Sequence, residues 1–102
     1  MKAFILCGGY GTRLDDEGKL KAKPMVKIGN KPILIHLIKF LCQQNIKDFV
    51  FCLGYKSNSV INYFIKENKK KTFVTHRSRD LIQFKYKSRN LNFNAALVYT
   101  GI

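Results

Sequence analysis

The residues best suited to chemistry lie in a glycine-rich segment near the start of the chain. Residues 3–7 are apolar, and Gly-Gly-Tyr-Gly-Thr-Arg-Leu follows them directly at residues 8–14, here called the glycine segment. Glycines let the main chain approach a ligand closely, because they carry no Cβ. Oriented backbone N–H groups bind anions, and a guanidinium such as that of Arg13 grips phosphate with two parallel hydrogen bonds. With Lys23 as a second positive charge, this pattern predicts a site for a phosphate-bearing nucleotide.

Two common phosphate-binding motifs do not account for the glycine segment. The dinucleotide fingerprint G-x-G-x-x-G would begin at Gly9 and continue through Gly11, but Leu14 occupies its third glycine position. The P-loop requires Gly-Lys-Ser or Gly-Lys-Thr, and the sequence contains neither tripeptide. A tight strand-to-helix turn is the simpler alternative for residues 8–11. We favour a phosphate site because a threonine, an arginine and a lysine accompany the glycines.

Alternating strands and helices must position these residues. Residues 2–7 read as a central strand, apolar on both faces like a parallel strand buried under helices. A helix is expected at residues 32–44, where Pro32 suits the first turn. Its apolar residues run nearly all round, so it should be deeply packed on all sides. A second helix is expected at residues 58–69. Further strands are expected at residues 46–53, 72–75, 81–87 and 95–99. This order predicts an α/β fold with a parallel sheet.

The sequence resembles the sugar-nucleotide pyrophosphorylases, which are nucleotidyltransferases that activate sugar 1-phosphates. The resemblance rests on the glycine segment and on Lys-Pro-Met at residues 23–25. Further similarity to the glucose-1-phosphate cytidylyltransferase branch lies at residues 25–34, 45–49, 52–56, 62–64 and 97–101. The resemblance implies the N-terminal portion of a Rossmann-like α/β/α sandwich, so residues 1–102 are expected to form an incomplete nucleotidyltransferase domain.

The resemblance also implies roles for individual residues. In the family, the loop arginine polarises the triphosphate and the lysine of Lys-Pro contacts the reacting phosphates, so Arg13 and Lys23 are the expected catalytic residues. The family's loop also holds the base and the phosphates. The residues expected to bind the nucleotide are Leu6, Cys7, Gly8, Gly9, Gly11, Thr12, Arg13 and Lys23.

The implied reaction is attack of a sugar 1-phosphate oxygen on the α-phosphorus of CTP, which gives CDP-glucose and pyrophosphate. Its physical demands are positioning and neutralisation of developing negative charge. Magnesium normally shares the second task in this family. The resemblance places the metal-binding and sugar-binding residues beyond the equivalent of Ile102, so we expect the chain alone to be inactive. A homo-oligomer and a partner chain that contributes the missing half both stay open.

Composition indicates one globular domain at most. The chain is 46% hydrophobic and 13% aromatic, which is typical of folded sequences. No apolar run approaches the ~20 residues that cross a bilayer, and residues 3–7 are too short for a signal-peptide core, so we expect a cytoplasmic location and no membrane partner. Cys7, Cys42 and Cys52 lack metal-ligand spacing and are expected to be free thiols.

The net charge of +13 raises the alternative of a nucleic-acid-binding domain. Most of the basic residues are lysines, scattered except at residues 69–71, and lysine serves solvated surfaces more often than it reads bases. We therefore expect no nucleic-acid partner. The small basic cluster of His76, Arg77 and Arg79 reads as a solvated loop. The acidic residues 15–17 are read the same way, because three successive side chains cannot all face one metal ion.

Three functions stay in competition on the sequence alone. They are a segment of a cytidylyltransferase, a truncated module that binds CTP without turning it over, and a basic nucleic-acid-binding domain. The glycine segment with Arg13 and Lys23 favours the first two over the third. If the family's later strands are missing, one edge of the strand at residues 3–7 should be open, and the chain should then associate.

Overall fold

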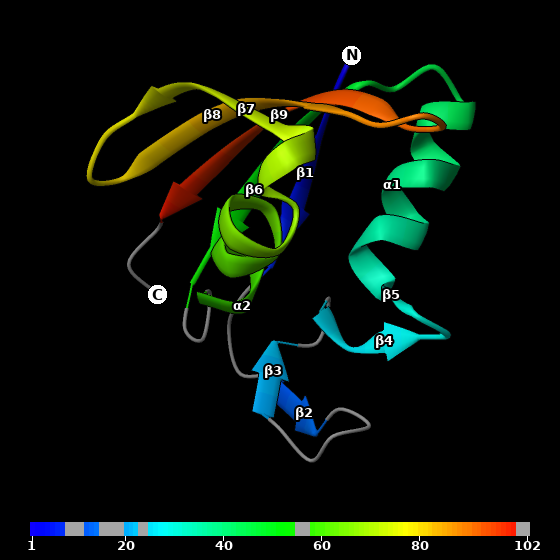
Figure 1. Ribbon diagram of the computed structural model, residues 1–102, viewed down its shortest axis with the longest axis vertical. Coiled ribbons are helices and arrows are strands. Elements are labelled where there is room, and N and C mark those ends of the chain that lie inside the picture. The colour runs from blue at the N-terminus through cyan, green and yellow to red at the C-terminus, as the bar shows by residue number, and fades with distance from the viewer. Residues whose placement is uncertain (8–11, 15–19, 23–24, 55–57, 100–102) are drawn as a thin grey trace.

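The computed structural model describes residues 1–7, 12–14, 20–22, 25–54 and 58–99, with the backbone alone for residues 12–14 and 20–22. Its main feature is a five-stranded sheet in the order β1, β6, β9, β8, β7 (Figure 1). The strands are β1 Lys2–Leu6, β6 Asp48–Leu53, β9 Asn92–Tyr99, β8 Leu81–Lys87 and β7 Thr72–Arg77. The first three run parallel, β8 pairs antiparallel with β9, and β7 pairs antiparallel with β8.

The parallel pairing depends on a helical crossover. Helix α1, Ile33–Gln43, connects β1 to β6, and parallel neighbours require a connection of this length. After the β7–β8 hairpin the chain turns back, and β9 pairs antiparallel with β8 on one side and parallel with β6 on the other. The α/β fold with a parallel sheet that the sequence predicts is confirmed.

Helix α1 begins and ends where its flanking residues change the backbone direction. Pro32 occupies the N-cap position with φ −59°, an angle that its ring enforces. Asn45, with φ 65°, follows the helix in the left-handed region that asparagine tolerates. Before α1, the short strands β4 Lys27–Ile28 and β5 Lys31–Pro32 form a hairpin whose turn contains Gly29 at φ 70°. The predicted helix at residues 32–44 therefore differs from the observed one only at its ends.

The second helical segment is less regular than predicted. It consists of α2 Asn58–Asn62, a π-helical turn η2 Tyr63–Glu67 and a 3₁₀ turn η3 Lys69–Lys71, where the sequence predicts one helix. The amide N–H and the side-chain Nδ2 of Asn68 both donate to the Tyr63 carbonyl, at 3.0 and 2.8 Å. Thr72 Oγ1 in turn donates to the Asn68 carbonyl at 2.9 Å. These bonds widen the last helical turn and end it.

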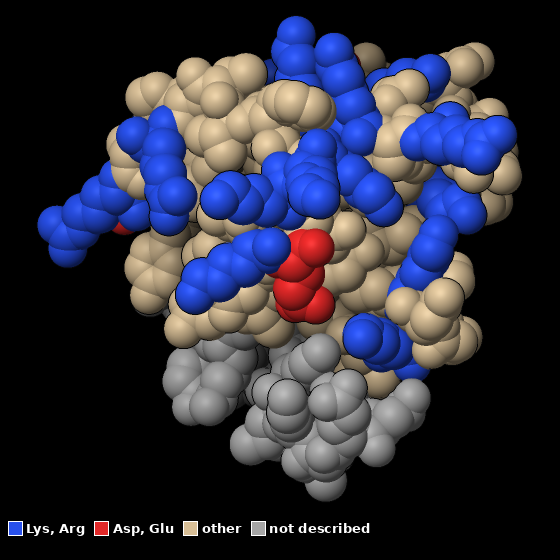
Figure 2. Space-filling view, in the orientation of Figure 1, with Lys and Arg blue, Asp and Glu red and all other residues tan. Residues whose placement is uncertain are grey.

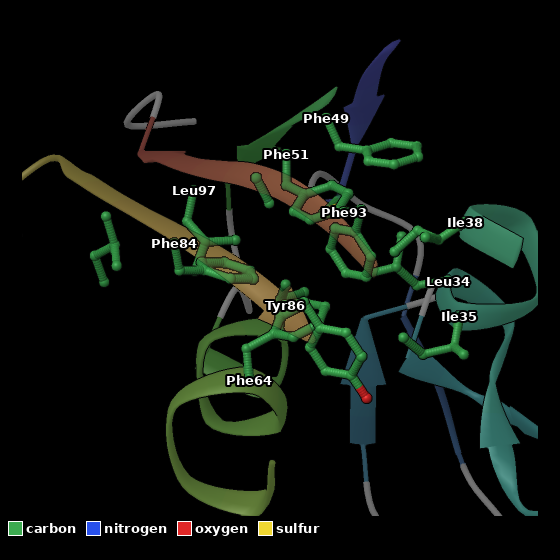
Figure 3. Close-up of a cluster of buried hydrophobic side chains, with 14 of the residues drawn as sticks. Leu34, Ile35, Ile38, Phe49, Phe51, Phe64, Phe84, Tyr86, Phe93 and Leu97 are labelled. Carbon is green, nitrogen blue, oxygen red and sulfur yellow. The ribbon is translucent and has the colours of Figure 1, made fainter. Parts of the chain in front are cut away.

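The hydrophobic core lies on one face of the sheet. Val60 and Phe64 from the second helical segment are fully buried against it, as the sequence predicts. The Phe64 ring lies 5.0 Å from that of Phe84 and 5.9 Å from that of Phe51, centroid to centroid (Figure 3). Leu34, Ile35 and Ile38 of α1 belong to the same cluster. Both helices therefore cover the same face of the sheet.

The opposite face of the sheet is covered by no element that the structure describes. The interpretation of residues 2–7 as a central strand buried on both faces is wrong for this chain, because β1 lies at the edge of the sheet. Its Phe4 and Leu6 side chains are 71% and 79% exposed. The prediction that α1 is deeply packed all round is also wrong, since Leu37 and Phe40 are 39% and 58% exposed. Local apolarity cannot reveal which face a partner element covers.

The remaining predictions concern turns and cysteines. β9 begins at Asn92, earlier than predicted. Ser88 closes the preceding turn, because its Oγ donates to the Leu91 carbonyl and accepts from the Leu91 N–H. His76 and Arg77 lie exposed in β7, whereas the sequence pattern predicts a loop there. The three cysteines are free thiols, as expected. Within the described ranges, no helix is long and apolar enough to cross a membrane.

Candidate functional site

The predicted nucleotide site follows the carboxyl end of β1. β1, β6 and β9 are parallel, so their carboxyl ends at Leu6, Leu53 and Tyr99 lie along the same border of the sheet, here called its carboxyl edge. Ligands of open α/β sheets bind outside this edge. Figure 1 shows both small hairpins, β2–β3 and β4–β5, beyond it. The location of the glycine segment in the chain therefore agrees with the general rule for such sheets.

Cys7 extends the pairing of β1 by one residue. Its N–H donates to the carbonyl of Cys52 at 2.9 Å, and its side chain is fully buried in the core. Burial raises the pKa of the Cys7 thiol to about 12, and the nearby Cys52 adds to the shift. The thiol therefore stays protonated at neutral pH and points away from solvent. A contact between Cys7 and a nucleotide would have to use its carbonyl group.

Leu6 differs from Cys7 in its surroundings. Its side chain is exposed on the face of the sheet opposite the helices, at the carboxyl end of the strand. An exposed apolar side chain at this position is free to contact a flat apolar ligand surface such as a nucleobase. Gly8, Gly9 and Gly11 lie outside the described residues.

A short antiparallel hairpin pairs the segment of Thr12 and Arg13 with the residues that precede Lys23. Its strands are β2 Thr12–Leu14 and β3 Leu20–Ala22. The register pairs Thr12 with Ala22 and Arg13 with Lys21. Directly paired residues have Cα atoms about 4.5–5.5 Å apart, so the backbone of Thr12 lies beside the residue that precedes Lys23. Lys23 itself lies outside the described residues.

The chain after Lys23 is anchored to the core. The Met25 side chain is buried, and the N–H of Ile33 donates to the Val26 carbonyl at 2.9 Å. His36 of α1 is exposed, and its Nε2 lies 3.0 Å from the Ile28 carbonyl. This contact joins α1 to the β4–β5 hairpin. These contacts hold the described residues from Met25 to Ile33 against the core and α1.

The described residues do not form a metal site. Among them, no group of three or more His, Cys, Asp or Glu side chains is placed to hold a metal ion. The acidic residues 15–17 lie outside the described part of the chain. Magnesium prefers oxygen ligands with octahedral geometry, and the described residues offer no such set. We therefore assign none of the described residues to magnesium binding.

Sequence reasoning missed two residues at the edge where the strands end. Gly54 is buried directly after β6, and Tyr99 is half exposed at the end of β9. Both residues lie at the same edge of the sheet as the end of β1, because the three strands are parallel and paired in register. The available signal was the predicted parallel topology, since the carboxyl ends of such strands meet at one edge.

Comparison with known proteins places these features in a family context. The family profile described as "Nucleotidyl transferase" matches residues 2–97. The glucose-1-phosphate cytidylyltransferase of Salmonella typhimurium is 44% identical over 102 residues, which cover 99% of this chain and 39% of that protein. A probable glucose-1-phosphate cytidylyltransferase of Bacillus subtilis is 43% identical over 65 residues, which cover 64% of this chain and 26% of that protein.

Similarity extends to proteins named for other bases and sugars. A mannose-1-phosphate guanyltransferase of Yarrowia lipolytica is 39% identical over 70 residues, which cover 69% of this chain and 19% of that protein. This chain spans well under half the length of each of these relatives, with 39% of the Salmonella protein as the largest share of the three.

Proposed function

We propose that this chain, which belongs to the nucleotidyl transferase family, forms the N-terminal, nucleotide-binding part of a glucose-1-phosphate cytidylyltransferase. The identity of 44% to the Salmonella protein of that name, along 99% of the chain, supports this choice within the family. The proposed substrates are CTP and glucose 1-phosphate. The cytoplasmic location expected from the sequence belongs to the same proposal.

The proposal rests mainly on the register of the β2–β3 hairpin. Thr12 and Arg13 lie about ten residues from Lys23 in sequence, and Thr12 pairs with Ala22, the residue that precedes Lys23. A phosphate chain needs positive groups on more than one side, and groups held in advance lower the cost of binding. The hairpin therefore supports the assignment of Arg13 and Lys23 to one site.

The proposed chemistry is a displacement at the α-phosphorus of CTP. A phosphate oxygen of glucose 1-phosphate forms the new bond to this phosphorus, and the bond to the β-phosphate oxygen breaks. CDP-glucose forms, and pyrophosphate leaves with the bonding electron pair. In this proposal the N–H groups of Gly8, Gly9 and Gly11 cradle the phosphates, with Leu6 and Cys7 at the base of the loop. Arg13, with Thr12, polarises the triphosphate, and Lys23 stabilises the charge on the reacting oxygens.

Calorimetric titration of the full-length protein with CTP tests the binding step. CTP should bind more tightly than duplex DNA at physiological salt, because contacts between scattered lysines and DNA phosphates weaken steeply with salt. Arg13→Ala should weaken CTP binding by about 1.5–3 kcal/mol, the usual contribution of a hydrogen bond to a charged group. Arg79→Ala removes the same charge from an exposed turn and is the matched control, which should leave CTP binding unchanged.

Two results would contradict the binding step. One is tight, salt-resistant binding of DNA without a CTP signal, which would favour the nucleic-acid-binding alternative. The other is equal loss of CTP affinity in both variants, which would indicate diffuse electrostatic attraction. For the chemical step, pyrophosphate release should require CTP and glucose 1-phosphate together. Residues 1–102 alone should bind CTP without forming CDP-glucose, and turnover by this segment would refute that part of the proposal.

A further inference from the structure

A cleft of about 470 Å³ lies on the side of the sheet that the helices cover. Lys27, Lys31 and Lys39, from β4, β5 and α1, line one part of it. Lys71 and Arg89 line it from the end of η3 and from the turn before β9. The volume lies within the roughly 300–1,000 Å³ that small-molecule sites occupy. Basic side chains from separate elements therefore converge on one cleft of ligand size.

The charges of the cleft are unbalanced. Glu67 is the one acidic residue among its described lining residues, against five basic ones. Figure 2 shows one large red patch near the centre, and a small one at the left margin, among many blue side chains on this face of the molecule. Like charges that share a partly enclosed space repel one another, and an anion placed between them removes this repulsion. The cleft therefore favours a ligand with more than one negative charge.

Neutral hydrogen-bond donors complete the lining. Tyr63 and Tyr86 contribute their phenol groups. Burial raises the pKa of Tyr63 to about 12 and also raises the pKa of Tyr86, so both hydroxyls stay protonated and can donate to an anionic oxygen. Asn68 lines the cleft as well, and it closes the π-helical turn that carries Tyr63 and Glu67. Single π-helical turns are frequent at functional sites.

We propose that this cleft binds a small anion that carries two phosphate groups. The described residues that line the cleft include neither Leu6 nor Cys7, which precede the glycine segment. The lining extends from the β4–β5 hairpin to the turn before the amino end of β9. Two phosphate groups can contact more of the five basic side chains at once than a single phosphate can. This inference does not depend on the proposed cytidylyltransferase activity.

Calorimetric titration with inorganic pyrophosphate tests the site in the full-length protein. All titrations use the Arg13→Ala background, which weakens any binding at the glycine segment. The double variant Lys31→Ala/Arg89→Ala removes one exposed cation from β5 and one from the turn before β9. Pyrophosphate affinity should then fall about tenfold or more. The matched control Lys66→Ala/Arg79→Ala removes the same charges from exposed positions outside the lining and should change the affinity less than about twofold.

Inorganic phosphate is the comparison ligand and should bind at least about tenfold more weakly than pyrophosphate. Backbone amide NMR shifts should follow pyrophosphate at residues 88–91 and 63–68. The inference would be overturned by absent pyrophosphate binding in the Arg13→Ala background, by equal losses in both double variants, or by equal affinity for phosphate. If Lys31→Ala/Arg89→Ala does not fold, Lys71→Gln takes its place, with Lys70→Gln as its control and the same expected contrast.

Discussion

Cys7 is held in place by both its backbone and its side chain. Its N–H completes the ladder between β1 and Cys52, and its thiol is buried beneath the helices. Burial disfavours the thiolate, so its pKa rises from an ordinary value of 9.0 to about 12. Cys7 thus fixes the carboxyl end of β1 in the core, and its thiol is not a reactive group at neutral pH.

This burial makes the stability of the protein sensitive to alkaline pH. In the unfolded chain the Cys7 thiol ionises near pH 9, whereas in the folded chain it stays protonated up to about pH 12. The unfolded state therefore loses protons first, and the free energy of unfolding should fall as the pH rises through this window. Below pH 8 the contribution of Cys7 is fully present.

Urea denaturation at pH 7.5, 9 and 10 measures the effect. Cys7→Ala should make the decline between pH 7.5 and pH 10 less steep, because alanine does not titrate. Cys52→Ala, which removes a half-buried thiol from the neighbouring strand, is the comparison variant. An unchanged slope in Cys7→Ala would show that other groups cause the decline.

At the scale of elements, the irregular second helical segment shapes one side of the cleft. The Asn68 side-chain Nδ2 donates to the Tyr63 carbonyl at 2.8 Å, and the backbone carbonyl of Asn68 accepts a bond from Thr72 Oγ1 at 2.9 Å. These bonds join the π-helical turn to the start of β7. The positions of Tyr63 and Glu67 along the cleft thus depend on a single asparagine at the end of the helix.

Replacing this asparagine should destabilise the segment. Asn68→Ala removes the side-chain bond to Tyr63 and should lower the free energy of unfolding by about 0.5–1.5 kcal/mol, the usual net contribution of such a bond. Urea denaturation measures this change. Asn90→Ala, at an exposed position in the turn before β9, is the matched control and should alter stability by less than about 0.5 kcal/mol. Equal effects of the two substitutions would show that the Asn68 side chain does not hold the end of the helix.

At the scale of the whole molecule, the sheet has one covered and one open face. The open face is formed by Phe4 and Leu6 of β1 and by the half-buried Val50, Cys52 and Val98 of the neighbouring strands. β1 is also an edge strand in the described structure. A flat apolar edge strand is a template for pairing with another chain, and large exposed apolar patches mark interaction surfaces.

Residues 1–102 produced alone should therefore associate as concentration rises. Phe4→Lys places a charge at the centre of the exposed β1 face and should shift the population toward monomer. Gln44→Lys adds the same charge just after α1, away from this face, and should leave association unchanged. Light scattering coupled to size-exclusion chromatography measures both. A clean monomer at all concentrations, with sharp reversible unfolding, would show that the open face needs no partner.

The positions of several elements and the family resemblance could be predicted from the sequence alone. The apolar runs, Pro32 and the glycine segment predict β1, α1 and β6 nearly at their observed positions, because strand and helix periodicities and proline geometry act over a few residues. The resemblance to nucleotidyltransferases likewise depends on short contiguous motifs, and the family match confirms it.

Only the tertiary structure decided how distant segments meet. The register that sets Thr12 beside Ala22, the position of β1 at the sheet edge and the π-helical turn at Tyr63 all depend on contacts outside the local sequence. The cleft is the clearest case, since its lysines look like scattered surface charges in the sequence. They converge because α1 and the second helical segment pack on the same face of the sheet, and burial of Ile38 and Phe64 in one core forces that arrangement.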